Sequence, residues 1–344
     1  MRTAIIGFGT AGEGRLHAYR TIPGARVAAV LDPSPQRRAR ARQIDPTVAT
    51  YAGLPELLAA EPVDAVDICT PPLYHVDLER AALTAGLHVI CEKPVAVHTD
   101  EALELVALAR QQERLLYPAH NYGFSPMMRV LTGAVTNGRI GPPSHAVFRI
   151  ARDSHARGVP GWQPDWRRDI SVARGGIMLD HGTHCAYMAT QLFGEAPRTV
   201  ACVAQWADDD AAGGMDVAAR ILLEFDGDRR CEIDLSWVSG TRSNRYRVTG
   251  PHGTADVHDG LAEVRSVHGA ERTDLTPPTR DQTHQEWFGG MFADFAGLVA
   301  AGTGWDRPMR EVITTTALIE AAYRSAALGG EPVVPAGRVT AEAQ

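Results

Sequence analysis

The sequence predicts an α/β protein of two domains, and three observations support this prediction. At 344 residues the chain is too long for one comfortable hydrophobic core. Up to residue 120, short apolar runs alternate with amphipathic stretches, which is typical of strand–helix repeats and a parallel sheet. Beyond residue 120, several runs alternate apolar and polar residues, which is typical of antiparallel strands with one solvated face. We expect domains over residues 1–120 and 121–344, the second an α/β domain with an open, mostly antiparallel sheet.

Each expected element rests on the spacing of its apolar residues. In the first domain, short apolar runs predict strands over residues 3–6, 26–31, 65–69, 88–91 and 115–118. Amphipathic stretches between them predict helices over residues 12–20, 35–43, 54–60, 74–85 and 99–112. In the second domain we expect helices over residues 126–137, 177–193, 284–301 and 309–328, a strand over 144–151, and several strands between residues 199 and 267.

Composition and charge argue against several classes of partner. The formal net charge is −7, so composition forces no basic face for a nucleic acid. No run approaches the roughly 18 to 20 apolar residues of a membrane span. The chain begins with a strand and a glycine turn in place of a signal peptide, and its five cysteines form no CxxC pair. We expect a reduced, cytoplasmic protein with no nucleic-acid or membrane partner.

A glycine-rich turn directly after the first expected strand carries the pattern GxGxxG. It comprises Gly7, Phe8, Gly9, Thr10, Ala11 and Gly12. In such a turn the first glycine makes the tight bend, the second lets the backbone approach a pyrophosphate, and the third permits close helix packing. The helix that follows offers free N–H groups to the phosphates. The pattern predicts a Rossmann dinucleotide-binding domain; a purely structural glycine turn is the alternative.

Asp32 lies 20 residues after Gly12, at the end of the second expected strand. A carboxylate at this place accepts the adenosine ribose hydroxyls of NAD and repels the 2′-phosphate of NADP. Asp32 therefore favours NAD as the cofactor. Arg37 and Arg38 nearby leave NADP open, and an aspartate that only caps the turn is the structural alternative.

Lys93 is the sole lysine among the 34 lysine and arginine residues of the chain. It follows the expected strand over residues 88–91. A guanidinium is effectively always protonated, whereas burial and neighbours can tune an amine until it exchanges a proton near neutrality. Lys93 is therefore a candidate for proton-transfer chemistry, with chance survival of a surface lysine as the alternative.

Thr70, Pro71 and His75 follow another expected strand, at the sheet edge where ligands bind in such domains. The prolines in this segment cannot continue a sheet, so the chain must leave it there. His75 could contact a ligand, or it could be a packed or helix-capping histidine.

Asp180, His181 and His184 fall on the helix expected over residues 177–193. Asp180 and His184 are four residues apart, hence on one helix face, whereas His181 would point about 100° away from Asp180. Because histidine is the side chain whose unperturbed pKa lies nearest neutrality, His184 is a credible acid–base group. A surface pair is the alternative. The three side chains also resemble a metal cluster, but no further ligand for an open metal site stands out elsewhere in the sequence, and we expect no metal.

Three segments together resemble the glucose-fructose oxidoreductase, inositol dehydrogenase and rhizopine-catabolism (Gfo/Idh/MocA) family. They are the glycine turn, the Thr70-Pro71-x-x-x-His75 motif, and the run from Ala85 to Pro94 that ends in Glu92-Lys93-Pro94. A fourth segment, Gly175 to His184, is similar to the family's GGxxxDxGxH pattern. The resemblance covers nearly the whole chain.

The resemblance implies a role for each matching residue. Lys93, Asp180 and His184 match the catalytic positions, and a cis Lys93–Pro94 peptide bond is implied. Cofactor contacts are expected from the glycine turn and from Asp32, Thr70, Pro71, His75, Glu92 and Lys93. Substrate contacts are expected from Lys93, Asn121, Trp166, Asp180, His181 and His184. Tyr187 stands where many members have an acid, which leaves open any substrate contact made by that acid.

The expected function is an NAD-dependent dehydrogenase that oxidises a secondary alcohol of a sugar, cyclitol or aminosugar, or reduces the matching ketone. Two alternatives from the same family are an NAD-assisted glycoside hydrolase and a non-catalytic dinucleotide-binding regulator. The presence of Lys93, Asp180 and His184 disfavours the regulator. The resemblance also implies a homodimer or homotetramer formed through the C-terminal sheet.

Overall fold

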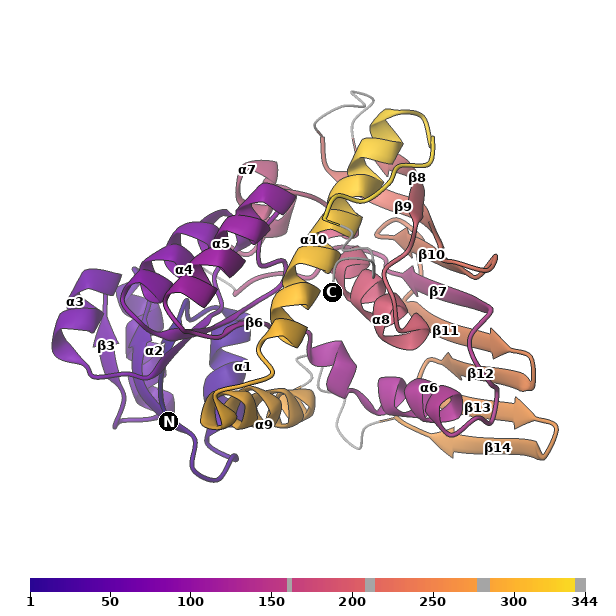
Figure 1. Ribbon diagram of the computed structural model, residues 1–344. Helices are drawn as coiled ribbons and strands as arrows, with labels where there is room; N and C mark the ends of the chain where they lie inside the picture. The colour runs from indigo at the N-terminus through magenta and orange to yellow at the C-terminus, as the bar shows by residue number, and fades with distance from the viewer. Residues whose placement is uncertain (160–162, 208–213, 277–284, 338–344) are drawn as a thin grey trace. The chain divides into compact units, whose positions relative to one another are not determined.

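The computed structural model describes residues 1–159, 163–207, 214–276 and 285–337, which form two compact units (Figure 1). The first unit comprises Met1–Asn121, Arg157–Trp166 and Asp281–Ile313. The second comprises Tyr122–Ala156, Arg167–Arg280 and Thr314–Gln344. Two segments that the sequence analysis assigned to the second domain therefore belong to the first unit.

A six-stranded parallel sheet with strand order β3-β2-β1-β4-β5-β6 forms the centre of the first unit. Its strands are β1 (Arg2–Ile6), β2 (Arg26–Leu31), β3 (Ala49–Tyr51), β4 (Ala65–Ile68), β5 (His88–Cys91) and β6 (Leu116–Pro118). Its helices include α1 (Thr10–Tyr19), α2 (Pro35–Ile44), α3 (Leu54–Ala60), α4 (His75–Thr84) and α5 (Thr99–Gln111), with the 3-10 turn η1 (Pro72–Tyr74) before α4. The predicted Rossmann domain is confirmed; β3 was not predicted.

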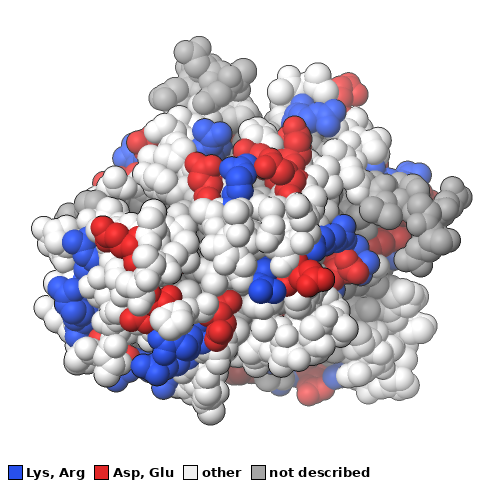
Figure 2. All heavy atoms as spheres, turned by 60° about the vertical axis from the view of Figure 1, so that its left-hand side comes forward, with Lys and Arg blue, Asp and Glu red and all other residues white. Residues whose placement is uncertain are grey.

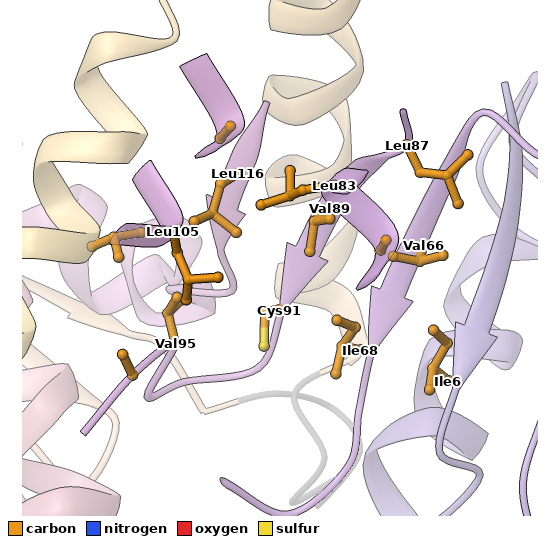
Figure 3. Packing of buried hydrophobic residues seen from close by; sticks show 14 of the residues in the cluster. Ile6, Val66, Ile68, Leu83, Leu87, Val89, Cys91, Val95, Leu105 and Leu116 are labelled. Carbon is orange, nitrogen blue, oxygen red and sulfur yellow. The ribbon is translucent and has the colours of Figure 1, made fainter. Parts of the chain in front are cut away.

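Apolar side chains from the parallel sheet and its helices form one buried cluster, part of which is drawn in Figure 3. Segments from late in the chain complete the first unit. The helix α9 (Gln285–Ala301) packs against α1, where the Phe288 and Phe292 rings lie 4.9 and 4.8 Å from the Tyr19 ring. Met309, from the start of α10 (Asp306–Ala327), is a member of the buried cluster.

An eight-stranded sheet with strand order β14-β13-β12-β11-β7-β10-β9-β8 forms the second unit (Figure 1). Its strands are β7 (His145–Ala151), β8 (Thr199–Trp206), β9 (Asp216–Glu224), β10 (Arg230–Ser236), β11 (Ser243–Gly250), β12 (Gly253–His258), β13 (Leu261–Ser266) and β14 (Gly269–Asp274). Only the β7–β10 pairing is parallel among these described strands. The prediction of a mostly antiparallel sheet is confirmed.

Helices cover one face of the eight-stranded sheet. They are α6 (Pro126–Thr136), α8 (Thr183–Phe193) and the later turns of α10, while the short helices η2 (Asn121–Phe124), η3 (Trp166–Arg168) and α7 (Ile170–Ala173) lie in the connections. Along β7, buried Ala146, Phe148 and Ile150 alternate with more exposed residues, so one face is packed and the other is open. Acidic and basic side chains lie intermixed on the face of the molecule drawn in Figure 2. Among the described helices, none is both long and apolar enough to cross a membrane.

Candidate dinucleotide and active-site residues

The three glycines of the first turn differ in what surrounds them. Gly7 adopts a φ of +88°, and a Cβ there would lie 2.8 Å from Thr70 Cγ2. A Cβ on Gly12 would overlap the carbonyl oxygen of Gly7. Around Gly9 no atom of the described chain lies within 4 Å of such a Cβ, which leaves the backbone open at the start of α1. These are the requirements of a turn that bends sharply, packs on its helix and receives a pyrophosphate.

Asp32 holds the glycine turn in place from the end of β2. Its carboxylate is buried and accepts hydrogen bonds from the backbone N–H groups of Phe8 (2.7 Å) and Ser34 (2.8 Å). Phe8 itself points into the core, so only its backbone belongs to the turn, whereas Thr10 and Ala11 are exposed. A carboxylate has about four acceptor sites, so these two bonds leave capacity for ribose hydroxyls.

The two arginines that left NADP open already have partners within the first unit. Arg37 donates to the carbonyl of Phe8 and pairs with Glu13 at 2.8 Å. Arg38 donates to the carbonyls of Asp32 (2.7 Å) and Pro33 (2.9 Å). These contacts hold both guanidiniums in place, but Arg38 uses only Nη1, so its remaining N–H groups keep NADP open as an alternative.

NADP is nonetheless expected to bind more weakly than NAD, by about 1 to 3 kcal/mol, because the Asp32 carboxylate repels the 2′-phosphate. Calorimetric titration of both cofactors measures the difference. Asp32→Asn, which keeps the side-chain shape and removes the charge, is expected to narrow it. Equal affinity of the unaltered protein for both cofactors would show that an arginine overrides the aspartate.

His75 ties the end of β4 to the segment after β5. Its side chain is 1% exposed, with Nδ1 at 2.7 Å from the Pro94 carbonyl oxygen and Nε2 at 2.8 Å from that of Thr70. Burial lowers its pKa, against the raising effect of these hydrogen bonds. Both ring nitrogens thus face backbone, which is the packed arrangement that the sequence left open. The Lys93–Pro94 peptide bond is cis, as predicted.

Glu92 is also held from within the first unit. Its carboxylate accepts a hydrogen bond from the buried Arg15 guanidinium at 2.6 Å, and Arg15 Nε lies 3.4 Å from the fully buried Asp67 carboxylate. The Arg15 guanidinium also stacks over the Phe288 ring at 4.3 Å. Glu92 therefore fixes the backbone immediately before Lys93 whether or not it also meets a cofactor.

His120 lies near Lys93, a relation that sequence reasoning missed. The imidazole is buried, and its pKa is lowered to about 3, first by burial and then by the nearby charge of Lys93. His120 is consequently neutral at physiological pH. The sequence could have indicated this, because His120 comes two residues after β6. It therefore lies at the carboxyl-terminal edge of the parallel sheet, which Lys93 also reaches after β5.

In the second unit, Asp216 at the start of β9 fixes the segment that carries Asp180 and His184. The Asp216 carboxylate accepts hydrogen bonds from the N–H groups of Gly176 and Met178, both at 2.7 Å, and from the Tyr323 hydroxyl at 2.7 Å. Burial raises its pKa to about 6, although the hydrogen bonds oppose this. A Cβ on Gly176 would overlap the Asp216 carbonyl oxygen, which explains the second glycine of the motif.

Gly176→Ala is accordingly expected to destabilise the protein by about 1 to 3 kcal/mol, because backbone must move to admit the methyl group. Turnover should fall as well, since the segment bearing Asp180 would shift. Urea unfolding measures the first effect. Gly133→Ala in α6, where only the far end of Asn137 approaches at 4.0 Å, is the matched control and should be neutral or stabilising. Equal stability of the two variants would contradict the packing argument.

The segment from Gly176 onward corrects two expectations. Met178–Gly182 is a π-helix (η4) followed by α8, so the first turn of the expected α-helix was wrong. Its wider turn accompanies the tight attachment of Gly176 and Met178 to Asp216. His181 does not point away from Asp180: its Nδ1 lies 3.3 Å from Asp180 Oδ2. Arg167 Nε approaches the same oxygen at 3.9 Å.

His184 stacks on a tyrosine that sequence reasoning did not single out. The rings of His184 and Tyr122 are 4.1 Å apart at 29°, and His184 is 7% exposed. Burial raises the pKa of Tyr122 to about 12, so its hydroxyl stays protonated at neutrality. Tyr187, in place of the family's acid, is buried with its hydroxyl where a side chain on Gly123 would lie. This position is therefore used for packing.

The remaining predicted substrate contacts lie in the connections. Asn121 is half-buried at the start of η2, and its N–H donates to the Ala119 carbonyl at 2.9 Å. Trp166 is half-buried at the start of η3, with its indole against Gly158. Among the residues that the structure describes, no group of three or more His, Cys, Asp or Glu side chains could hold a metal ion.

The fold and the glycine turn define a dinucleotide-binding protein. Two family models match the chain: an oxidoreductase family with an NAD-binding Rossmann fold over residues 1–120, and the GFO/IDH/MocA C-terminal domain over residues 128–256. The chain belongs to the GFO/IDH/MocA oxidoreductase family, as the sequence motifs indicated.

The similarity to known proteins covers almost the entire chain. D-apiose dehydrogenase of Paraburkholderia graminis is 29% identical, over 95% of this chain and 88% of its own length. Inositol 2-dehydrogenase of Rhizobium meliloti is 26% identical, over 95% of this chain and 97% of its own. An oxidoreductase from Agrobacterium radiobacter, solved with NAD+, L-tartaric acid and magnesium, has the same fold with a TM-score of 0.85 at 22% identity, covering 97% of this chain and 98% of that one.

Proposed function

We propose that this protein is an NAD-dependent dehydrogenase that oxidises a secondary alcohol of a sugar, cyclitol or aminosugar, or reduces the matching ketone. One observation carries the proposal: the motifs that contain Lys93, Asp180 and His184, to which we assign the family's catalytic roles, stand in a chain whose first unit has a turn suited to a pyrophosphate. Relatives named for apiose and inositol support the substrate class.

The glycine turn and Asp32 fit NAD, since the backbone at Gly9 is open and the carboxylate keeps free acceptor sites. When bound, the cofactor supplies a hydride acceptor at its nicotinamide ring. The residues of the chain supply binding, orientation and proton transfer.

His184 is the proposed acid–base group. Stacking on Tyr122 restricts the imidazole plane, so the ring is oriented before an alcohol arrives. Asp180 carries negative charge on the same segment and is oriented by His181 and Arg167. Such a charge favours the imidazolium that forms when His184 takes the alcohol proton.

Lys93 is the proposed second catalytic group. Its amine donates hydrogen bonds to the alcohol oxygen and stabilises the negative charge that develops there as the carbonyl forms. Arg15, through Glu92, and His75, through Pro94, hold the backbone on both sides of Lys93. A catalytic group must be held within about 0.5 Å of its productive position, and this support from two sides helps to hold Lys93 there.

The test is to incubate the purified protein with NAD and a panel of sugars, inositols and aminosugars, and to follow the absorbance of reduced nicotinamide. Accumulation of reduced cofactor with at least one of them is expected. Release of free sugar from a glycoside with no net reduction would establish the hydrolase. Cofactor binding without either reaction over a broad panel would favour the regulator.

We also propose a cytoplasmic homodimer or homotetramer formed through the open face of the eight-stranded sheet. Val203 on β8 is 53% exposed on this sheet, and Arg245 and Arg247 pair with Asp256 across neighbouring strands of the open face. All five cysteines are free and buried, in keeping with a reducing compartment. Light scattering after gel filtration measures the oligomeric state.

A further inference from the structure

Two arginines flank one end of the paired strands β7 and β11 in the second unit, and the charge of Arg242 acts on that of Arg152. The antiparallel register of β7 and β11 joins Asn244 to Ile150 and Ser243 to Ala151. The next residue beyond this pairing is arginine on each chain segment, Arg152 after β7 and Arg242 before β11. Like charges this close repel each other unless something compensates them.

Both arginines belong to the side of the sheet on which His184 lies. Side chains alternate between the faces of a strand, so Arg152 shares its face with buried Ile150 and Phe148, and Arg242 shares its face with buried Tyr246. The π-helix before α8 packs on this face, where Gly182 approaches Leu235 and Ile221. Arg149, by contrast, is exposed on the open face.

Arg152 is buried without an acidic partner. It is 5% exposed, and its Nη1 donates to the carbonyls of Ala151 (2.7 Å) and Ser243 (3.3 Å). Among the described residues, no carboxylate lies within ion-pair distance of Arg152 or of the exposed Arg242. A buried charge is costly unless it is paired, so this arrangement lacks a counter-ion.

The nearby acids are engaged elsewhere. Asp180 faces His181 and Arg167. Asp259 accepts hydrogen bonds from the Asn244 N–H at 2.6 Å and the Ser243 hydroxyl at 3.0 Å. Arg152, Arg242 and Asp180 all act electrostatically on Tyr122, the ring that stacks on His184. Asp180 also acts electrostatically on Arg152 without forming an ion pair with it, so the positive charge beside the proposed acid–base group is only partly compensated.

We propose that Arg152 and Arg242 form a subsite for an anionic substituent of the substrate, a carboxylate or a phosphate carried by the sugar or cyclitol. The proposal rests on the proposed function for the identity of the carbon skeleton. Arg242 is exposed and accessible to a ligand, while Arg152 is fixed by two backbone carbonyls, which orients its remaining N–H groups. Guanidiniums bind carboxylate and phosphate through two parallel hydrogen bonds.

The probes are D-glucuronate, D-glucose 6-phosphate and neutral D-glucose, titrated calorimetrically into the protein saturated with NADH. At least one anionic sugar is expected to bind ten times more tightly than glucose or better, and which of them does so distinguishes carboxylate from phosphate. Arg242→Gln is expected to reduce this preference about tenfold or more. Arg149→Gln removes an arginine from the open face of the same sheet and should retain the preference.

Glucose binding as tightly as both anionic sugars would overturn the subsite, as would an equal effect of the two variants or the absence of binding by either anionic sugar. Turnover is measured separately with the same three sugars. Anion-selective binding without reduction of NAD by any alcohol of the wider panel would leave the subsite standing and refute the dehydrogenase. Turnover of neutral sugars without a preference for anionic ones would support the dehydrogenase and refute the subsite.

Discussion

His184→Ala is expected to lower kcat by a factor of roughly 10² or more, the usual contribution of a positioned acid–base group. NAD affinity should change little, since the cofactor turn belongs to the first unit. Steady-state kinetics on the best substrate of the panel give the measurement. His145→Ala removes a histidine that pairs with Glu232 at 2.9 Å in the sheet, and serves as the matched control with near-normal turnover.

Lys93→Ala should cost a similar factor, and the double variant should be scarcely worse than the poorer single one, because groups that serve one step are not additive when removed. Lys93→Arg should lose most turnover despite its retained charge, since the larger planar guanidinium cannot place its N–H groups where the compact ammonium donates to the alcohol oxygen. Near-normal kcat in folded His184→Ala would remove that residue from the mechanism. Retention of kcat within about tenfold by Lys93→Arg would show that charge alone suffices.

We expect the free energy of unfolding of the unaltered protein to depend on pH through Glu79 in the first unit. Glu79→Gln is expected to abolish most of this dependence. Glu79 on α4 is fully buried, and burial raises its pKa from 4.5 to about 8, with the Cys91 thiol beside it lowering it only in part. Its neighbours on α4 and β5, among them Leu83 and Cys91, belong to the apolar cluster (Figure 3).

The sign follows from which state holds the proton. Between pH 4.5 and about pH 8 the folded protein keeps Glu79 protonated while the unfolded chain releases the proton, so stability falls as pH rises through this window. Across this window the free energy of unfolding falls by about 1.4 kcal/mol per pH unit, and by roughly 3 to 5 kcal/mol in total.

Urea unfolding at pH 5.5 and pH 8 measures the effect, as the difference between the unaltered protein and each variant. Glu79→Gln should flatten the slope of stability against pH. Glu79→Met, of similar volume and without charge, should be more stable than the unaltered protein at pH 8. Glu104→Gln is the control, because Glu104 on α5 is 59% exposed and pairs with Arg80. An identical slope in Glu79→Gln and the unaltered protein would show that Glu79 is not the titrating group.

The elements of the first unit could be predicted from sequence because its strands are buried on both sides and stand out as apolar runs. The exception was β3, in which Ala49, Thr50 and Tyr51 are all only half-buried and too few to show a period. The helices α9 and α10 were also expected, over residues 284–301 and 309–328. That these helices pack in the first unit was not predicted. Periodicity shows that a helix has an apolar face, but it does not show which hydrophobic core that face packs against.

The candidate site was predictable where function depends on local sequence. The glycine turn and the segment before His184 carry their own patterns. Asp216 and Tyr122, which fix and stack on that segment, lie 40 and 62 residues away from Gly176 and His184 in the chain, and neither belongs to a motif. Such partners are determined by packing, which leaves no mark on local spacing.

The interleaving of the two units has a consequence for how the protein is made. The parallel sheet emerges first from the ribosome, yet α9, the start of α10 and the rings of Phe288 and Phe292 that cover Tyr19 are synthesised almost last. The nascent first unit must therefore wait with an apolar surface uncovered while the whole eight-stranded sheet is translated. A fragment ending near residue 120 would keep that surface permanently, and we expect it to aggregate on expression, whereas a chain extended to residue 337 should not.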